Sequence, residues 1–306
     1  MTGPAPAATH PPRQPSVAVA LGGGGARGMA HIHAIEALDE LGIRPVAVAG
    51  SSIGAIMGAG LCAGIPARAI RAHVTNTFGN PAELAARVWK LRPAMMGGMS
   101  RTGFRFGQMD VARIIAAFLM PLPERFEDLS VPLTVTAVDY YAHKEVHLTS
   151  GDLASALAAS AAIPGVFRPV RRDGRILIDG GIYNPCPFDL IAGKADITVA
   201  IDVVGGPVGS DLREPSTIDC IVGANQLMMR SLVEEKRRIR APTIYLRPQA
   251  SPVRALDFHR AGEVIDATAH LKHELIGALL RHGVVPPAVT AAERQGTDVE
   301  AALPSP

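Results

Sequence analysis

Ser52 is the residue whose neighbours in the sequence most clearly predict chemistry. It lies at the centre of residues 50–54, Gly-Ser-Ser-Ile-Gly, which match the G-x-S-x-G pattern. In that pattern a serine occupies a sharp turn between a strand and a helix, with its hydroxyl exposed. The unpaired amides and the positive dipole end of a helix start favour the negative charge that develops as such a serine attacks. Ser before an apolar helix is also a common N-cap, so the pattern alone leaves both roles open.

A glycine-rich loop precedes this turn and could supply backbone amides to the same site. Residues 23–28, Gly-Gly-Gly-Ala-Arg-Gly, satisfy G-x-G-x-x-G, a pattern that also marks dinucleotide-binding folds. Such a fold needs an acidic residue at the end of the second strand, but that strand ends in Gly50 and Ser51. A P-loop needs Lys-Ser or Lys-Thr after the glycines, and neither follows here. We therefore interpret the loop as a row of amides that could stabilise an oxyanion formed when Ser52 attacks a carbonyl.

Asp179 is a candidate carboxylate partner for a nucleophile. It ends a short apolar run and precedes Gly180 and Gly181, so little steric bulk surrounds it. In isolation, a turn role for this Asp-Gly pair is the favoured interpretation. Asp139 ends another predicted strand, but no glycines surround it and a turn or structural role is favoured. Asp202, near the end of a further buried strand, is a third candidate carboxylate.

The histidines favour neither a catalytic triad nor a metal site. Four of them follow Asp179 in the Ser, Asp, His order of α/β-hydrolases, but they fall on a predicted helix, and Ser52 comes after only two predicted strands. Two others are spaced by one residue and point to different faces of a helix, which is poor metal geometry. No metal or cofactor is expected. The four are His259, His270, His273 and His282, and the pair is His31 and His33, of which His31 is expected to pack behind the glycine loop.

Composition narrows the classes of partner. The chain has 306 residues, of which 48% are hydrophobic, and a formal net charge of +2, so it can bury a sizeable core and shows no strong electrostatic preference. Aromatic residues make up only 4%, which leaves few platforms for stacking bases, and nucleic acid is not expected as a partner. The cysteines show neither C-x-x-C spacing nor a secreted disulfide pattern, which favours a reducing compartment. They are Cys62, Cys186 and Cys220.

Periodicity predicts strands and helices between two tails. Residues 1–15 are predicted to be a disordered tail without the features of a secretory signal peptide, and residues 286–306 a flexible Ala- and Pro-rich tail. Glycines interrupt the weakly charged run at 45–67, so we expect a strand, a turn and a helix there and no transmembrane anchor. Strands are also expected at 17–21, 133–140, 145–149, 175–178, 197–204 and 243–246, and helices at 66–76, 81–91, 109–119, 152–162, 216–240 and 256–280.

Residues 92–109 mix Met and Phe with Arg and Gly and follow no periodic pattern. A mobile apolar flap over a lipid-accepting mouth would have this composition. A surface loop with a few packed Met side chains would have it equally. Membrane contact through this stretch is therefore a hypothesis that the sequence leaves open.

In this order and spacing, the motifs resemble those of the patatin-like phospholipase family. Residues 23–28, 50–54 and 179–181 are similar to its oxyanion loop, nucleophile elbow and general-base motif. Further similarity at 161–167, 180–187 and 256–261 extends the resemblance over most of the chain. The resemblance implies an α/β, three-layer fold with a central, mainly parallel sheet flanked by helices, within a domain at residues 16–285.

The resemblance also implies an activity and its residues. The protein would be a serine lipid acyl hydrolase of the phospholipase A, lysophospholipase or esterase type. Ser52 would attack an acyl ester, Asp179 would take its proton without a histidine, and water would release the acyl group. An apolar pocket would raise the pKa of Asp179 toward the useful range. The oxyanion would be held by the loop Gly23, Gly24, Gly25, Ala26, Arg27 and Gly28, in which Arg27 would steady the loop or a phosphate, and the motif glycines would be Gly50, Gly54, Gly180 and Gly181.

Such an enzyme would be cytoplasmic, or peripherally bound to a membrane, and would act on a phospholipid or a related lipid ester. The alternative from another class is a catalytically idle scaffold or regulatory protein that keeps the fold. The intact Ser52, Asp179 and glycine loop disfavour it. Nucleotide binding through the loop is disfavoured by the missing acidic residue.

Overall fold

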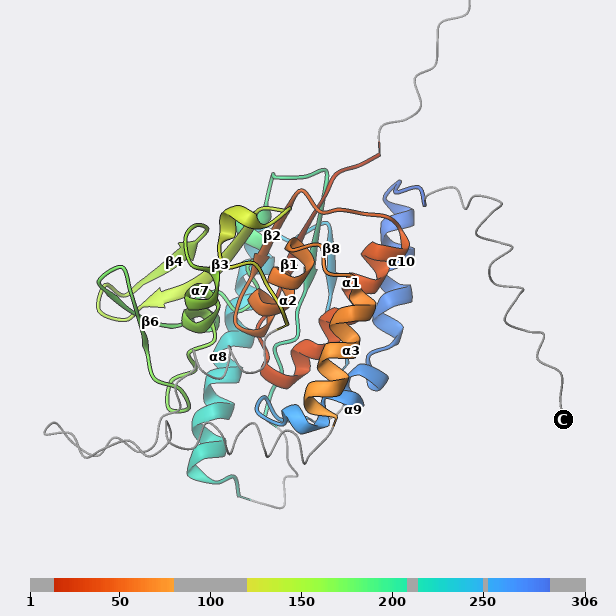
Figure 1. Cartoon of the computed structure of the whole chain (residues 1–306). Coiled ribbons are helices and arrows are strands. Elements are labelled where there is room, and N and C mark those ends of the chain that lie inside the picture. The colour runs from red at the N-terminus through yellow and green to blue at the C-terminus, as the bar shows by residue number, and fades with distance from the viewer. Residues whose placement is uncertain (1–13, 80–119, 208–213, 250–252, 287–306) are drawn as a thin grey trace, which may run out of the picture.

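The computed structural model describes residues 14–79, 120–207, 214–249 and 253–286, arranged as in Figure 1. Its centre is an eight-stranded sheet in the order β5-β6-β3-β2-β1-β7-β8, with β4 paired to β3 outside this path. The strands are β1 (Val17–Leu21), β2 (Ala47–Gly50), β3 (Leu133–Asp139), β4 (Lys144–Leu148), β5 (Val170–Arg172), β6 (Arg175–Asp179), β7 (Ile197–Ile201) and β8 (Ile244–Leu246).

Parallel pairing dominates this sheet. β3, β2, β1, β7 and β8 run parallel to one another, whereas β4, β5 and β6 add antiparallel pairs at the β3 end. All five residues of β1, at the centre, are buried. Short apolar strands buried on both faces are typical of a parallel sheet covered by helices. The predicted α/β fold with a mainly parallel central sheet is confirmed, and only the short, partly exposed β5 was not foreseen.

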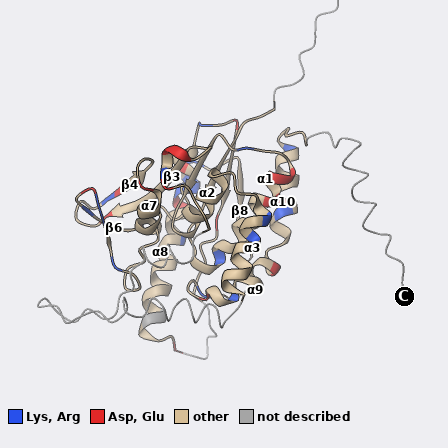
Figure 2. Ribbon diagram, in the orientation of Figure 1, with Lys and Arg blue, Asp and Glu red and all other residues tan. Residues whose placement is uncertain are grey.

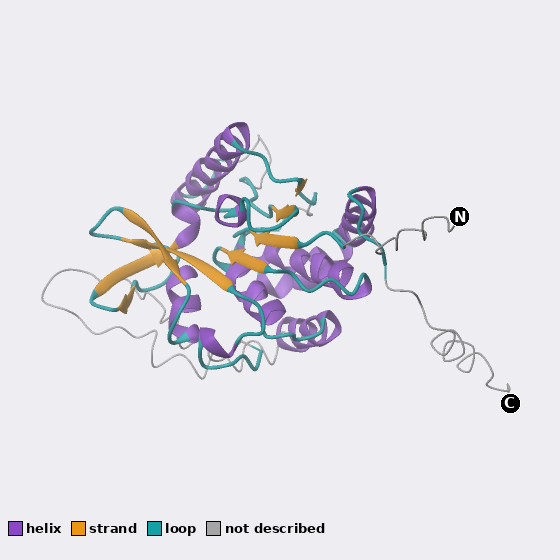
Figure 3. Cartoon of the chain, turned by 90° about the horizontal axis from the view of Figure 1, so that it is seen from above, coloured by secondary structure: helices purple, strands orange, loops and turns teal. Residues whose placement is uncertain are grey.

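Helices cover both faces of the sheet, as Figure 3 shows. In β1 the larger side chains Val17, Val19 and Leu21 belong to the main core, which includes residues of α1, α2 and α10, whereas Ala18 and Ala20 face a smaller core with η4 and α8. The helices are α1 (His31–Glu40), α2 (Ile53–Cys62), α3 (Ala67–Phe78), α7 (Leu153–Ser160), α8 (Thr217–Ile239), α9 (Ala261–Ala267) and α10 (His270–Arg281), with short helices η1 (Gly25–Ala30), η2 (Phe126–Asp128), η3 (Gly180–Ile182), η4 (Phe188–Ile191) and η5 (Phe258–Arg260).

The ends of β2 and β6 meet on one edge of β3. Gly50 at the end of β2 is opposite Val135, and Asp179 at the end of β6 is opposite Ala137. β4 occupies the other edge of β3 over this stretch. Because β2 is parallel to β3 and β6 is antiparallel to it, their carboxyl ends point toward each other across the one intervening residue, Thr136. The turn after β2 and the turn after β6 are thereby brought together.

The last predicted helix differs from the structure. Residues 256–280 were expected to form one helix, but η5, α9 and α10 divide this segment. After Thr268, the Ala269 amide donates to the Asp266 carbonyl and the Leu271 amide to the Thr268 carbonyl, each three residues back. The regular bonding to the carbonyl four residues back is therefore interrupted between α9 and α10. The helix expected at 216–240 is confirmed as α8.

Several predicted segments lie outside the described residues. They are the helices at 81–91 and 109–119, the Met- and Phe-containing stretch at 92–109, and nearly all of the tails at 1–15 and 286–306. These predictions therefore stay predictions, as does the domain boundary at 16–285.

Candidate active site

Ser52 occupies the turn between β2 and α2 in a strained conformation, with φ 53° and ψ −125°. A positive φ is uncommon for a residue with a side chain and persists where the surrounding structure enforces it. The Ser52 amide donates to Ser160 Oγ at 2.8 Å. Its hydroxyl makes no capping bond to α2 and instead donates to Asp179 Oδ2 at 2.8 Å. The serine is thus held on a strained turn with its hydroxyl directed at a carboxylate.

Two glycines beside Ser52 allow α2 to lie directly against the sheet. A Cβ on Gly54 would lie 2.1 Å from the Leu21 carbonyl oxygen at the end of β1, and a Cβ on Gly50 would lie 2.5 Å from Ala55 Cα. Backbone atoms cannot yield at such distances without moving the helix. The start of α2 is therefore held over the ends of β1 and β2 by the absence of these side chains.

Asp179 is buried at the end of β6, with 6% of its surface exposed. Its Oδ1 accepts from the Gly181 amide at 2.7 Å and its Oδ2 accepts from the Ser52 hydroxyl at 2.8 Å. Burial raises the pKa of the Asp179 carboxyl to about 6, although these two hydrogen bonds oppose the rise. Gly180 lies so close to β3 that a Cβ there would be 2.3 Å from the Thr136 carbonyl oxygen. A carboxyl held in this way can take up and return a proton near neutral pH.

Three of the six predicted oxyanion residues, Gly23, Ala26 and Gly28, are not among the residues that line the cavity beside Ser52. Gly23 nevertheless lies against Ser52, since a Cβ on Gly23 would be 3.2 Å from the Ser52 Cβ. The Gly23 amide donates to the Pro185 carbonyl and the Ala26 amide donates to the Ala255 carbonyl, each at 2.7 Å. Gly28 packs against the first side chain of α2. These contacts fix the loop, and they leave the Gly23 and Ala26 amides already bonded.

The other three, Gly24, Gly25 and Arg27, line a cavity together with Ser52. Gly25 has a φ of 61°, and a Cβ there would lie 1.9 Å from the Ala255 carbonyl oxygen, so only glycine fits. Within the described part of the chain, the amides of Gly24 and Gly25 donate to no backbone carbonyl outside η1. They are therefore the amides of this loop that remain available at the cavity.

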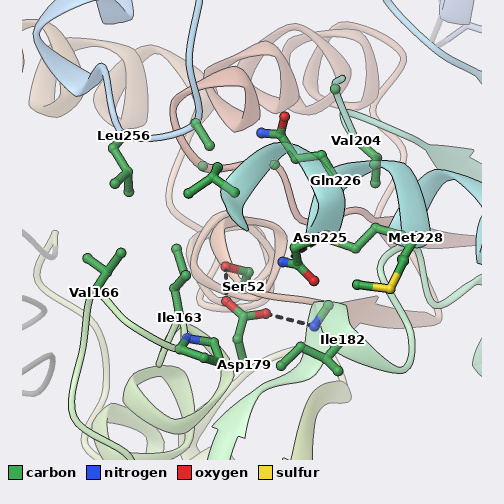
Figure 4. Close-up of a pocket in the computed structure, with 18 of the residues that line it drawn as sticks. Ser52, Ile163, Val166, Asp179, Ile182, Val204, Asn225, Gln226, Met228 and Leu256 are labelled. Atoms are coloured by element: carbon green, nitrogen blue, oxygen red, sulfur yellow. Dashed lines mark hydrogen bonds between the residues drawn. The ribbon is translucent and has the colours of Figure 1, made fainter. Parts of the chain in front are cut away.

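The cavity has a volume of about 340 Å³, within the roughly 300–1,000 Å³ typical of small-molecule sites. Ser52 and Asp179 lie at its base, as Figure 4 shows. Its walls come from α8, from the loop after α7 and from the loop before η5. The apolar side chains that line it are Ile163, Pro164, Val166, Ile182, Val204, Ile221, Val222, Met228, Met229, Ala255 and Leu256.

Sequence comparison assigns the chain to a family. The sequence model of patatin-like phospholipases matches residues 19–192, more than half of the chain, and this span includes the glycine loop, Ser52 and Asp179. The chain belongs to the patatin-like phospholipase family. The resemblance read from the motifs is therefore confirmed.

Relatives of this patatin-like chain include proteins of the NTE family. An uncharacterized NTE family protein of Mycobacterium tuberculosis is 39% identical over 211 residues, which cover 67% of this chain and 54% of that protein. Lysophospholipase NTE1 of Mycosarcoma maydis is 31% identical over 195 residues, which cover 61% of this chain and 10% of that protein. The chain thus spans about half the length, or less, of these curated relatives. Among solved structures, VipD from Legionella pneumophila matches 87% of this chain and 67% of its own, with a TM-score of 0.43 and 15% identity.

Three polar residues at the patatin-like site carry no signature in the sequence. Ser160, at the end of α7, is fully buried and accepts the hydrogen bond from the Ser52 amide. Asn225 and Gln226 of α8 line the cavity, and Figure 4 shows the Asn225 amide on the side of Ser52 and Asp179. The sequence predicts α8 and α7 as helices but contains no local pattern that places these residues at the site.

The competing carboxylates have other partners. Asp202 is fully buried and bonded to Arg247 and Tyr245. Asp139 Oδ1 accepts from the Ala142 amide at 3.0 Å in the turn after β3, which agrees with the predicted turn role. Both side chains are therefore committed to structural contacts.

The histidines also lie away from the reacting groups. His31 Nε2 lies 2.8 Å from the Gly22 carbonyl oxygen, and burial lowers the pKa of His31 to about 4, so the ring is neutral and donates this bond. His31 thus packs behind the glycine loop, as predicted. None of the four histidines weighed as triad members is among the residues that line the described cavity: His259, His270, His273 and His282.

The described ranges contain neither a membrane-spanning helix nor a cluster of metal ligands. No helix in them is both long enough and apolar enough to cross a bilayer. In the same ranges, no three His, Cys, Asp or Glu side chains gather in an arrangement that could hold a metal ion.

Proposed function

We propose that this protein is a serine lipid acyl hydrolase of the phospholipase A, lysophospholipase or esterase type. One observation carries the proposal. The Ser52 hydroxyl donates to Asp179 Oδ2 at 2.8 Å at the base of an apolar cavity. A nucleophile and a base within hydrogen-bond reach are the minimum for acyl transfer through a covalent intermediate, and apolar walls suit the hydrocarbon part of a lipid ester.

Acylation begins when Ser52 Oγ attacks the ester carbonyl and its proton passes to Asp179. The amides of Gly24 and Gly25, two residues that line the cavity, are the proposed donors to the resulting oxyanion. When the tetrahedral intermediate collapses, the bond to the alcohol oxygen breaks and Asp179 returns the proton to the departing alcohol. The acyl group remains on Ser52 as an ester.

Deacylation repeats these steps with water. Asp179 takes a proton from a water molecule, whose oxygen attacks the acyl carbonyl, and the carboxyl then protonates Ser52 Oγ as the fatty acid is released. A base with a pKa of about 6 suits both halves of the cycle, since it is mostly ionised at neutral pH and still accepts a proton in the transition state. Each proton taken up in one step is returned in the next.

Turnover of a short-chain p-nitrophenyl ester and of a lysophospholipid tests the proposal. Wild type should release product from both, and Ser52→Ala and Asp179→Asn should each lose several orders of magnitude while remaining folded. Asp139→Asn is the matched control, because Asp139 is a carboxylate at a neighbouring strand end with a turn contact. Wild type should also label with a fluorophosphonate, and Ser52→Ala should not.

A wild-type protein that hydrolyses neither ester and does not label with the fluorophosphonate would make the catalytically idle scaffold the better interpretation. If Asp179→Asn stayed active, the base would lie elsewhere. Protection of the wild type against thermal unfolding by a nucleotide would instead favour nucleotide binding at the glycine loop.

We also propose that the mouth of the cavity contacts a phospholipid bilayer peripherally. Ile221, Met228 and Leu256 line the cavity and are nevertheless 63%, 61% and 42% exposed. Residues 220–229 of α8 contain no charged side chain, which Figure 2 shows as a tan stretch of this helix. A bilayer is the partner that fits, because it can cover these side chains and deliver its own lipid to the cavity. The three free cysteines agree with the cytoplasm as the proposed compartment.

Cosedimentation with phosphatidylcholine vesicles tests this contact. The double variant Ile221→Glu with Met228→Glu should bind vesicles more weakly than wild type, because two charges would enter the contact. Ile239→Glu is the matched control, since Ile239 is 86% exposed at the far end of the same helix. Equal binding by all three proteins would remove the support for this surface.

A further inference from the structure

Arg27 brings a buried positive charge to the cavity. It lies in η1, two residues after Gly25, and only 5% of its surface is exposed. Its Nη2 donates to the Gly206 carbonyl at 3.1 Å. Gly205 lies flat against it, so that a Cβ on Gly205 would be 2.0 Å from the guanidinium carbon. The guanidinium is thus fixed against the loop that follows β7.

Gln226 completes this arrangement from α8. It is 8% exposed, and its hydrogen-bond partners assign the orientation of its amide. The amide nitrogen donates to the Gly206 carbonyl at 3.0 Å, and the amide oxygen accepts from Arg27 Nη1 at 3.2 Å. In Figure 4, Asn225 and Gln226 extend from α8 in different directions, and Asn225 lies on the Ser52 side. Helix α8 therefore contributes one side chain to the cavity near Ser52 and another that binds Arg27 of the glycine loop.

The partners of Arg27 are all neutral. Among the described residues, its hydrogen bonds go to a backbone carbonyl and to the Gln226 amide. The carboxylate that acts on it electrostatically is Asp257, whose Oδ2 accepts from the Arg254 amide at 3.2 Å. No carboxylate in the described part of the chain is hydrogen-bonded to the guanidinium. Its charge is therefore held in place without being neutralised by direct contact.

We propose that Gln226 is a positioning residue that fixes Arg27 while leaving its positive charge effective at the oxyanion loop. The inference rests on the proposed hydrolase function of the same site. A fixed charge close to the point where an oxyanion develops stabilises the transition state more than the ground state, because it needs no reorganisation as the reaction proceeds. A carboxylate at position 226 would hold Arg27 more tightly through a charge-assisted bond and would cancel that field.

Two substitutions separate the positioning role from a purely structural one. Gln226→Glu keeps the size of the side chain and its bond to Arg27 but adds a negative charge. Gln226→Met keeps a similar length but loses both hydrogen bonds. We expect Gln226→Glu to lower kcat for a neutral p-nitrophenyl ester by about tenfold to a hundredfold, with a Tm equal to or above that of Gln226→Met. Gln226→Met should lower Tm and reduce kcat by less.

The proposal predicts that Gln226→Glu has the lower kcat and Gln226→Met the lower Tm. A purely structural role predicts instead that the variant with the lower Tm also has the lower kcat. Ser231→Glu is the matched control, because it adds a carboxylate to the exposed side of the same helix and should leave kcat unchanged. The rate of fluorophosphonate labelling of Ser52 should fall in the same order as kcat.

Wild-type kcat in Gln226→Glu would overturn the inference, and so would a kcat that follows Tm across the two variants. A wild-type protein that neither hydrolyses the ester nor reacts with the fluorophosphonate would overturn the proposed function itself and the inference with it. The two failures are therefore distinguishable, because the first requires an active wild type.

Discussion

Asp179 and Asp202 are both buried carboxylates at the ends of sheet strands, and both precede glycines in the sequence. Their surroundings differ in one respect. Asp202 accepts from Arg247 Nε at 2.8 Å, from the Tyr245 hydroxyl and from the Val204 amide. Asp179 is bonded to a serine hydroxyl and a backbone amide, and no Lys or Arg of the described residues is paired with it. Asp179 and Asp202 therefore differ in a paired cation rather than in burial or in their position at a strand end.

The presence of Arg247 beside Asp202, and of no such cation among the described residues beside Asp179, determines how burial affects the two carboxyl groups. Burying an ionised carboxylate is costly unless a positive partner and hydrogen bonds replace the lost water. Arg247 supplies this for Asp202 and also bonds to Glu234 of α8, at 2.8 Å, so the end of β7 is tied to that helix. Without such a partner, burial instead raises the pKa of Asp179 to about 6. The cost of desolvation is therefore offset by an ion pair at Asp202, whereas at Asp179 it appears as a raised pKa.

The largest expected contrast between the two residues is in turnover. Asp179→Asn should lower kcat for a short p-nitrophenyl ester by about 10²–10⁴, the range attributed to a general base. Asp202→Asn should leave kcat within a few fold once the rate is corrected for the folded fraction. Steady-state kinetics with parallel circular dichroism spectra would measure both. Similar losses in the two variants would break the distinction.

The second contrast is in stability and runs in the opposite direction. Asp202→Asn should lower the free energy of unfolding by about 2–4 kcal/mol, since it removes the buried carboxylate of the pair and leaves Arg247 with Glu234 as its remaining anionic partner. The value is below that for a fully buried pair because the Arg247 side chain is 23% exposed. Urea denaturation followed by fluorescence or circular dichroism would give the difference. A loss below 1 kcal/mol would show that the pair contributes little.

Asp179→Asn should instead raise the free energy of unfolding at pH 7 by about 1–3 kcal/mol. The folded-state pKa of about 6 lies above the ordinary value of 3.8, so the folded protein binds this proton more tightly than the unfolded chain does. Stability from this group is present below pH 3.8 and is lost as pH rises to about 6, by about 3 kcal/mol. Asn removes the ionisation, so urea denaturation of this variant should show a gain at pH 7 that disappears near pH 4.

The smallest effect concerns the pH dependence of the wild type. Since Asp179 must be ionised to accept a proton, kcat/KM should fall about tenfold per pH unit on the acid side, with a midpoint near 6. Asp202→Asn should leave this midpoint in place, because Asp202 does not contact the reacting groups. A midpoint near 4 in the wild type would mean that the carboxyl is better solvated than its burial indicates.

Local motifs predicted the parts of the candidate site that lie on turns. Ser52 and Asp179 each sit at a strand end beside glycines, and both the strained serine backbone and the buried carboxylate have recognisable sequence contexts. The sheet followed from apolar runs bounded by glycine or polar residues. The proposed catalytic roles of Ser52 and Asp179 remain predictions that the experiments above test.

Contacts between distant segments could not be predicted in the same way. Only Gly24 and Gly25 remain as candidate oxyanion donors because the Gly23 and Ala26 amides are bonded to the carbonyls of Pro185 and Ala255. These two carbonyls lie more than 150 residues further along the chain. The contribution of Gln226 depends on where α8 crosses the cavity. No periodicity specifies such a crossing, because the spacing that makes a helix amphipathic does not say which side chain meets which loop.

The strands β2 and β6 meet end to end along β3, and different parts of the structure therefore set the proposed chemistry and the proposed substrate selectivity. The separation of Ser52 from Asp179 depends on backbone pairing to β3 on either side of Thr136, whereas the walls of the cavity come from α8 and two loops. Mutations in those walls can therefore change which ester is accepted while the reacting pair stays in register. An insertion within β3 would have the opposite effect, because a one-residue slip would turn a whole strand over. The sheet therefore sets the spacing of the proposed reacting pair, and segments outside the sheet largely set the shape of the cavity.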